Sequence, residues 1–198
     1  VEVGSGHSTR FLARAVADGD LPTLITAIDP APRAAIRELP VQWLAATLQN
    51  AGNAPFDGLV AGDILFIDSS HVLMPGSDVD MLVNRILPAL PAGVRVHIHD
   101  IFLPDDYPAA WEWRGYNEQL AVAALLHGGG YRPLFAGHYV ATRMAGAAAR
   151  AIWKAPITLV AWLSWKSWAV SSSRSSAATN LVVPALLTRA STRPHWAT

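Results

Sequence analysis

Short apolar runs alternate with amphipathic stretches along the first 144 residues of this 198-residue chain. The runs at residues 24–28, 64–67 and 94–98 end in polar residues, a pattern typical of strands buried on both faces of a parallel sheet. Between the last two runs, apolar residues recur at the spacing of one helix face: Val79, Leu82, Val83, Ile86, Leu87 and Leu90. This alternation predicts an α/β fold, with a doubly wound, mostly parallel sheet and helices on both faces.

Turn signals mark where the predicted elements begin and end. Ser77-x-x-Asp80 has the form of a capping box that starts the helix just described, and Pro88 and Pro91 end it.

Three further segments complete the predicted fold. Residues 117–126 form a helix that Asn117 caps and that three glycines stop. Residues 131–135 and 139–143 predict an antiparallel hairpin at the C-terminal edge of the sheet. Residues 30–58 should supply the third strand, and Val41 is a possible strand centre.

A glycine turn opens the chain, in the sequence Glu2-Val3-Gly4-Ser5-Gly6-His7-Ser8-Thr9. A strand that ends in glycines lets the backbone approach a nucleotide-like ligand, and Ser8 or Thr9 can cap the helix that follows. A dinucleotide fingerprint needs a third glycine where Thr9 stands, and a P-loop needs a lysine, whereas the first lysine is Lys154. A dehydrogenase and a P-loop phosphate site are therefore disfavoured.

Asp29 ends the next apolar run, about 20 residues beyond the glycine turn. A carboxylate at this place can accept hydrogen bonds from both hydroxyls of a ribose. The alternative is that Asp29 caps a short helix that runs to Leu39 with Pro30 in its first turn.

Polar side chains also follow the two later runs. Asp68, Ser69, Ser70 and His71 come after the first, and His99 and Asp100 end the second. Because parallel strands bring their carboxyl ends to one edge of a sheet, where open α/β sheets bind ligands, we expect these groups to share a site.

Together these motifs resemble those of the class I S-adenosylmethionine-dependent methyltransferases. The Glu-x-Gly-x-Gly turn is similar to motif I of that family, and Phe-Ile-Asp-Ser-Ser-His and His-Asp resemble the fourth and fifth strand ends of a subgroup that acts on small molecules. The resemblance implies a Rossmann-like fold whose last two strands form an antiparallel pair. Since the family has helices before its first strand, it also implies a chain truncated at the N-terminus.

The resemblance also implies a set of cofactor contacts. The acid lies near the amino group of the methionine part, the glycines pass under the carboxypropyl arm, and His7 lines the ligand. The expected S-adenosylmethionine-binding residues are Glu2, Gly4, Ser5, Gly6, His7, Ser8, Asp29, Asp68 and Ser69.

For catalysis, two interpretations of Asp68, His71, His99 and Asp100 stay open. A histidine can take the proton of a hydroxyl acceptor as the methyl is transferred. Alternatively, Asp68 and Asp100 can hold Mg²⁺ or Mn²⁺, which lowers the pKa of the acceptor hydroxyl. Because His99 stands where some relatives have another acid, the histidine is the preferred interpretation.

The acceptor is expected to be a small molecule methylated at oxygen, since no Asn/Asp-Pro-Pro-Tyr string is present. Residues 107–119, rich in aromatic side chains, form either the acceptor wall or a surface loop. A remnant that keeps the fold and binds ligand without turnover is the alternative function.

Composition divides the chain into a predicted domain, residues 1–144, and a tail, residues 145–198. All 15 acidic residues precede the tail, which holds five of the eight tryptophans and no acid. The preferred interpretation is that the tail lies outside the core, as when a gene is read out of frame. The second is a segment that lies on a membrane surface. A nucleic-acid contact is the third, and no motif supports it. The chain contains no cysteine, which excludes disulfides and thiol catalysis, and we expect a cytoplasmic protein.

Overall fold

A computed structural model describes residues 1–144, 146 and 185–189. Seven strands form one sheet in the order β3-β2-β1-β4-β5-β7-β6. The strands are β1 (Glu2–Val3), β2 (Thr26–Ile28), β3 (Gln42–Leu44), β4 (Ile64–Ile67), β5 (Arg95–Ile98), β6 (Tyr131–Ala136) and β7 (Ala185–Arg189). The first five in this order pair in parallel, which confirms the predicted Rossmann-like α/β fold.

The centre of the sheet is buried because its strands carry apolar residues on both faces. β4 and β5 pair in register from Ile64 opposite Arg95 to Ile67 opposite Ile98. Leu65 and Val96 lie opposite one another and are fully buried, so helices must cover this part of the sheet.

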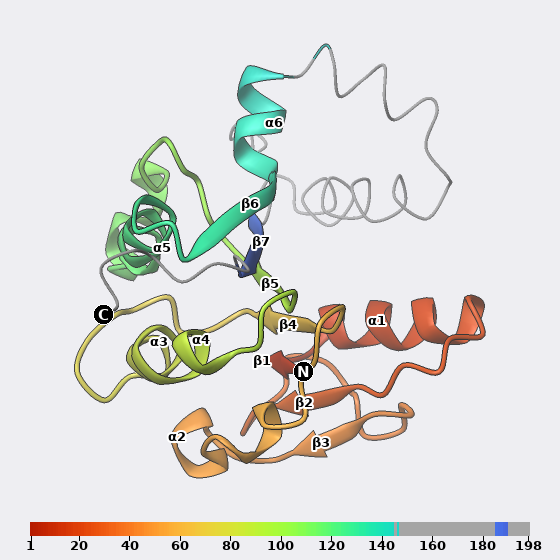
Figure 1. The fold of residues 1–198 in the computed structure, drawn as a ribbon. Coiled ribbons are helices and arrows are strands. Elements are labelled where there is room, and N and C mark those ends of the chain that lie inside the picture. The colour runs from red at the N-terminus through yellow and green to blue at the C-terminus, as the bar shows by residue number, and fades with distance from the viewer. Residues whose placement is uncertain (145, 147–184, 190–198) are drawn as a thin grey trace.

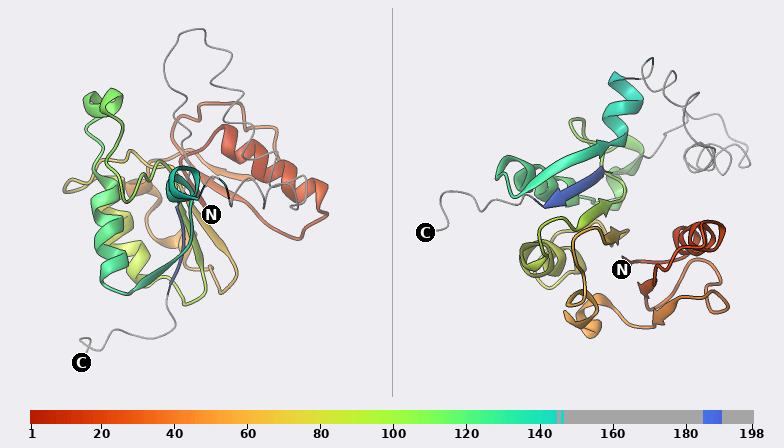
Figure 2. Two further views of the ribbon diagram at one scale, coloured as in Figure 1. Left: turned by 90° about the horizontal axis from the view of Figure 1, so that it is seen from above. Right: turned by 45° about the vertical axis from the view of Figure 1, so that its right-hand side comes forward.

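Helices cover both faces, as Figures 1 and 2 show. Helix α1 (His7–Asp18) lies on one face, and α5 (Glu118–His127) and the helix after residue 77 lie on the other. Shorter helical turns are α2 (Leu48–Ala51), η1 (Ala54–Phe56) and η3 (Ala109–Arg114). The first helix begins at His7 with Gly6 as its N-cap, so the expected cap at Ser8 or Thr9 is wrong. Instead, the Thr9 hydroxyl accepts a hydrogen bond from the backbone N–H of Gly6.

The helix predicted after residue 77 is present as three consecutive pieces. They are α3 (Asp78–Met81), a π-helical turn η2 (Leu82–Ile86) and α4 (Leu87–Ala89). Ser77 caps the first piece by accepting from the N–H of Asp80, whose own carboxylate accepts from Gly76. The apolar stripe faces the sheet as expected: Val79, Leu82, Ile86, Leu87 and Leu90 are buried, and its sixth member, Val83, is half-buried.

The predicted C-terminal hairpin is wrong. Residues 137–143 form helix α6 (Gly137–Arg143), because Asp105 binds both His138 and Arg143 and so holds them on one side of a helical turn. The antiparallel neighbour of β6 is β7, which also pairs antiparallel with β5. The sheet therefore has its antiparallel strand, but residues 185–189 supply it.

Strand β7 lies within residues 145–198, which were expected to form a tail outside the core. Leu187 in this strand is 1% exposed and belongs to the main hydrophobic cluster. Leu187 is thus part of the core and residues 185–189 are part of the sheet, whereas residues 145, 147–184 and 190–198 of the predicted tail lie outside the described residues.

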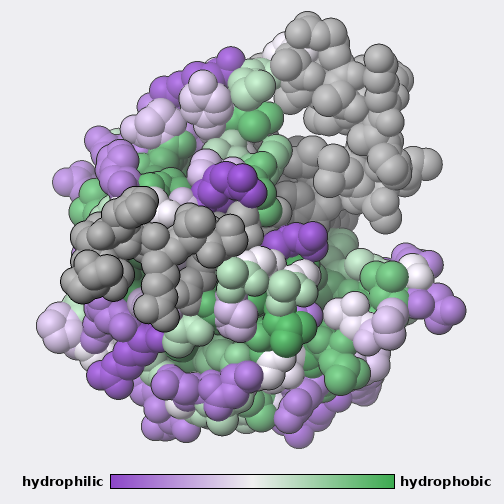
Figure 3. Space-filling model, in the orientation of Figure 1, coloured by the Kyte–Doolittle hydropathy of each residue, from purple (hydrophilic) through white to green (hydrophobic). Residues whose placement is uncertain are grey.

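On the face shown in Figure 3, hydrophilic residues form most of the outline, and hydrophobic ones gather nearer the middle. Within residues 1–144, 146 and 185–189, no helix combines the length and the apolar character needed to cross a membrane.

Candidate active site

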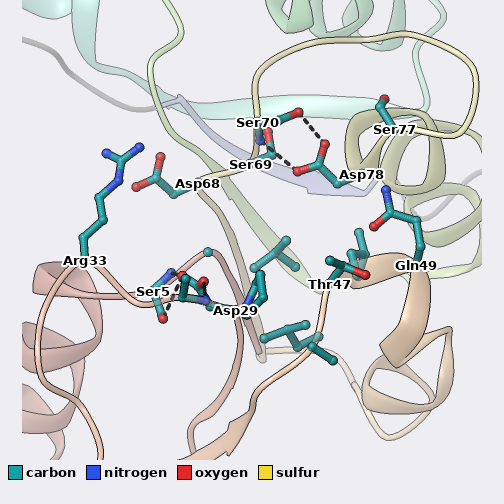
Figure 4. A pocket seen from close by; sticks show the side chains of 17 residues that line it. Ser5, Asp29, Arg33, Thr47, Gln49, Asp68, Ser69, Ser70, Ser77 and Asp78 are labelled. Atoms are coloured by element: carbon teal, nitrogen blue, oxygen red, sulfur yellow. Dashed lines mark hydrogen bonds between the residues drawn. The ribbon is translucent and has the colours of Figure 1, made fainter.

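A cavity of about 490 Å³ opens where the carboxyl ends of β1, β2 and β4 meet (Figure 4). This is the point where the strand order reverses, since β1 lies between β2 and β4. The residues that line the cavity are Val3, Gly4, Ser5, Ile28, Asp29, Pro30, Ala31, Arg33, Ala46, Thr47, Leu48, Gln49, Asp68, Ser69, Ser70, Ser77 and Asp78. Its size suits a nucleoside-sized ligand.

Gly4 allows the floor of this cavity to form. Its φ is +80°, and a Cβ atom built there would lie 2.1 Å from the backbone oxygen of Asp68. Only glycine lets the ends of β1 and β4 approach so closely. The close approach at Gly4 is therefore one between two strands, whereas the predicted approach of this backbone to a ligand stays a prediction.

Glu2 lies behind the turn rather than in the cavity. It is 1% exposed, and its carboxylate accepts hydrogen bonds from the hydroxyls of Ser8 (2.6 Å) and Thr9 (2.7 Å). Burial raises the pKa of Glu2, and the hydrogen bonds from these hydroxyls oppose that change. Glu2 thus ties the glycine turn to the first turn of α1. Its contact with the ligand stays a prediction.

Asp29 points into the cavity and organises its edge. The Oδ2 atom accepts hydrogen bonds from the backbone N–H (2.7 Å) and the hydroxyl (2.9 Å) of Ser5, and Oδ1 accepts from the N–H of Ala31 (2.7 Å). The alternative helix after Asp29 is wrong, since no residue between 30 and 39 is helical. The predicted glycine turn and the predicted acid, Asp29, are therefore joined by direct hydrogen bonds.

Besides Glu2, three of the predicted cofactor residues do not line the cavity. His7 is exposed at the start of α1, and Ser8 is engaged with Glu2. Gly6, with φ +144°, approaches the backbone of Ala34 and belongs to the turn without lining the cavity.

Several lining residues were missed by the sequence analysis: Arg33, Thr47, Gln49, Ser77 and Asp78. Arg33 extends toward Asp68 from the opposite wall, and Thr47 and Gln49 enter from the loop and helix after β3 (Figure 4). Asp78 accepts hydrogen bonds from the N–H and the hydroxyl of Ser70. Ser77 was assigned only to helix capping, Asp78 was given no role, and residues 30–58 offered no motif from which Arg33 or Thr47 could be chosen.

Next to the cavity, His71 brings together three carboxylates. Its Nδ1 lies 2.8 Å from Glu118 Oε2, and its Nε2 lies 3.3 Å from Asp68 Oδ1 and 3.8 Å from Asp100 Oδ2. His71 is 3% exposed. The predicted cluster of Asp68, His71 and Asp100 is therefore present. Glu118, from α5, is a member that no sequence motif indicated.

These contacts fix the charges of the cluster. Burial by itself would lower the pKa of His71, but hydrogen bonds with Asp68 and Glu118 and the nearby negative charges raise it to about 10. Burial would raise the pKa of Asp68, but the hydrogen bond with His71 and the charges of His99, His71 and Arg33 lower it to about 2. At neutral pH the ring of His71 is therefore a cation, and it cannot accept a proton.

The backbone at this cluster is unusual. His71 (φ +61°) and Asp100 (φ +54°) both adopt the left-handed conformation, which is uncommon for residues other than glycine. The carbonyl of His71 accepts hydrogen bonds from the N–H groups of Asn117 and Glu118 at the start of α5. The side chain of Asn117 is bound to Leu73, so the expected Asn117 side-chain cap is replaced by the His71 carbonyl.

Asp100 also contacts the second predicted histidine. His99 Nε2 lies 3.2 Å from Asp100 Oδ1, and the ring is largely buried. His97, two residues earlier on β5, stacks on Phe66 at 3.9 Å between ring centroids and is buried, as expected for a core histidine. Asp100 thus lies between His99 and His71, so one carboxylate links the two rings.

The residues present do not fit the alternative in which Asp68 and Asp100 hold a metal ion. The His71 cation stands between these two carboxylates, with its Nε2 directed at both. Among the described residues, no group of three or more His, Asp or Glu side chains has an arrangement that could hold a metal ion.

Beyond His71, a second cavity of about 390 Å³ is formed by residues 106–120. The rings of Tyr107, Trp111 and Tyr116 stand edge-on to one another, and Tyr116 packs on His71 with 4.6 Å between centroids. The aromatic stretch that was predicted to be either an acceptor wall or a surface loop therefore lines a cavity next to the cluster.

Comparison with known proteins agrees with this geometry. A family model described as a methyltransferase domain matches residues 1–101, slightly more than half of the chain, and the protein belongs to this family. The match spans the glycine turn, Asp29, Asp68 with His71, and His99 with Asp100. No curated protein and no solved structure matches the chain.

Proposed function

We propose that this protein transfers a methyl group from S-adenosylmethionine to a hydroxyl group of a small molecule. The observation that carries the proposal is the cavity at the Gly4–Ser5 turn, whose floor depends on Gly4 and whose edge carries the Asp29 carboxylate. Membership of the methyltransferase domain family supports methyl transfer in general. The proposal adds the identity of the cofactor, S-adenosylmethionine, and the kind of acceptor, a hydroxyl group.

The lining residues supply groups that suit each part of the cofactor. Asp29 keeps a lone pair on Oδ1 for one ribose hydroxyl, and rotation of the Ser5 hydroxyl would make room for the second. Arg33 offers a cation for the methionine carboxylate. Thr47 and Gln49 line the part of the cavity beyond Asp29, where the adenine would lie.

When bound, S-adenosylmethionine supplies a sulfonium methyl: the acceptor oxygen forms the new C–O bond, the S–C bond breaks, and sulfur keeps that electron pair. This chain's own residues must then orient the acceptor and remove its proton. Of the two predicted histidines, His99 is assigned as the base, with Asp100 as its orienting partner at 3.2 Å. Since His99 lines neither cavity and its Nδ1 is buried, this assignment requires the ring to turn toward the acceptor when the ligands bind. His71 is assigned a positioning role, because its ring is already protonated and holds Asp68 and Asp100 in place.

Isothermal titration of the full chain with S-adenosylhomocysteine tests the proposal. We expect saturable binding, weakened about tenfold or more by Asp29→Ala, since a hydrogen bond to a charged group is worth about 1.5–3 kcal/mol. Asp18→Ala is the matched control, because Asp18 is an exposed acid paired only with Arg14 in the next turn of α1.

Two outcomes would change the conclusion. Tighter binding of NAD than of S-adenosylhomocysteine would overturn the choice of cofactor. If S-adenosylmethionine and S-adenosylhomocysteine both bind saturably but no hydroxyl acceptor is methylated, the alternative is favoured. The protein would then be a remnant that keeps the fold and binds ligand without turnover.

A further inference from the structure

The second cavity, formed by residues 106–120, has the character of a site for a flat ring. Its walls include Tyr107, Trp111 and Tyr116, whose neighbouring ring centroids lie 5.7 and 5.9 Å apart at steep angles. Pro108 and Leu120 add apolar surface. A ligand ring that enters meets both edges and faces of aromatic side chains, and these are the contacts that aromatic pairs prefer.

Arg114 holds two of these rings from outside the cavity. Its guanidinium lies 4.5 Å from the centroid of Trp111 and 5.4 Å from that of Tyr116, and it donates a hydrogen bond to the Tyr116 hydroxyl at 2.9 Å. Because the cation is engaged with these side chains and does not line the cavity, it fixes the wall and makes no direct contact with a ligand there.

The charges that do line the cavity are negative. Asp106 and Glu112 are exposed at its edge, and the described lining residues include no Lys or Arg. The phenol of Tyr107 is neutral at physiological pH, since burial raises its pKa well above its usual range. An anionic ligand would therefore be repelled, whereas a neutral or cationic ring is accepted.

The cavity and the cofactor site have no lining residue in common and adjoin one another across two side chains, Tyr116 and His71. Tyr116 packs against His71, and His71 holds Asp68, which lines the first cavity. The base assigned above, His99, reaches the same cluster through Asp100.

We propose that this second cavity binds the methyl acceptor, and that the acceptor is a hydroxylated aromatic compound without negative charge. The inference rests on the function proposed above. It adds the substrate class and names Trp111 and Tyr107 as binding residues.

Three para-substituted phenols distinguish the charge classes: tyramine as cation, 4-ethylphenol as neutral compound and 3-(4-hydroxyphenyl)propionate as anion. Titration of each into the full chain saturated with S-adenosylhomocysteine should give binding of all three, with the anion weaker than 4-ethylphenol by about fivefold or more, the range for two exposed charges. Glu112→Gln should reduce the preference for tyramine over 4-ethylphenol by about two- to fivefold, the range for one exposed charge.

Trp111→Ala should weaken binding of 4-ethylphenol about fivefold or more, since a lost aromatic pair is worth about 0.5–1.5 kcal/mol besides its buried area. Trp113→Ala is the matched control. Trp113 also stacks on Arg114, at 5.1 Å, but it is 80% exposed and does not line the cavity. Trp111→Phe should restore most of the affinity, and thermal melts of each variant show whether the fold is intact.

Different binding results would overturn the acceptor site and the proposed function. If S-adenosylhomocysteine binds and none of the phenols does, or if Trp111→Ala and Trp113→Ala behave alike, the acceptor assignment is overturned and the cofactor proposal stands. If the phenols bind and S-adenosylhomocysteine does not, the proposed function is overturned, and with it the role of this cavity as an acceptor site.

Discussion

The imidazole of His71 and the carboxylate of Glu118 lie 2.8 Å apart, although 47 residues separate them in the chain. Both side chains are almost completely buried, and Glu118 also accepts a hydrogen bond from the Ser69 hydroxyl at 3.0 Å. This contact ties the start of α5 to the end of β4. It also fixes the protonation state of His71, on which the assignment of the catalytic base depends.

The charge of His71 predicts a pH dependence of stability. Its pKa is raised from 6.5 to about 10, so the folded protein holds this proton more tightly than the unfolded chain does. The resulting stabilisation is complete below about pH 6.5 and is lost as the pH rises through about 10. Urea melts at a series of pH values across this range should show that the free energy of unfolding falls as the pH rises. The free energy should fall less steeply with pH in His71→Asn.

Asparagine is chosen at this position because it tolerates the positive φ of His71. At neutral pH the variant should be destabilised by about 3–5 kcal/mol, since it leaves buried carboxylates without their cation. His127→Asn, at the exposed end of α5, should leave the slope unchanged. An equal slope in the unaltered protein and His71→Asn would show that His71 is not the titrating group.

Alanine substitutions at Gly4 and Gly52 distinguish the cost of backbone strain from the cost of a steric clash. Both have positive φ, but a Cβ atom at Gly4 would meet the Asp68 carbonyl, whereas one at Gly52 would have nothing within 4 Å. Gly52→Ala should cost about 1–2 kcal/mol, from conformation alone. Gly4→Ala should cost a further 1–3 kcal/mol or so and abolish binding of S-adenosylhomocysteine. Equal losses of stability in the two variants would contradict the close approach of β1 and β4.

Leu187 tests whether residues 185–189 belong to the core. Because its side chain is 1% exposed, Leu187→Ala should destabilise the protein by about 2–5 kcal/mol in denaturant melts. Leu24→Ala is the control: Leu24 is 93% exposed, and its loss should change stability by no more than about 0.5 kcal/mol. A neutral Leu187→Ala would mean that β7 does not pack in the sheet.

The assignment of His99 as base predicts a change in the rate profile. A histidine that accepts the acceptor's proton imposes an acid limb, because the protonated ring cannot act. His99→Ala should remove this limb and lower kcat by about a hundredfold or more. Asp100→Asn should keep the limb at reduced rate, and His127→Ala, at the exposed end of α5, should change neither the limb nor kcat. An unaltered limb in His99→Ala would assign the proton transfer to another group.

Local pattern was enough to predict the parallel half of the fold. The apolar runs that became β2, β4 and β5 are buried on both faces, and a run of that kind has few stable alternatives to a central parallel strand. The same pattern predicted that polar residues at the strand ends would gather at one edge, and Asp29, Asp68 and Asp100 do lie there.

Contacts between residues far apart in the sequence decided which segments form the C-terminal helix and the antiparallel strand, which the local pattern could not predict. Residues 139–143 have side chains that suit a strand, but Asp105 binds His138 and Arg143 and holds the segment as a helix. The place of that strand is taken by residues 185–189, which hydrogen-bond to both β5 and β6.

By itself, then, the sequence determined the α/β fold, the glycine turn with its acid, and the identity of the residues at the strand ends, because each depends on neighbours a few positions away. Only the tertiary structure decided that Glu118 faces His71, that Arg33 and Thr47 line the cavity, and that His71 carries a charge. Burial and electrostatic partners set those properties, and both depend on segments that meet only when the chain is folded.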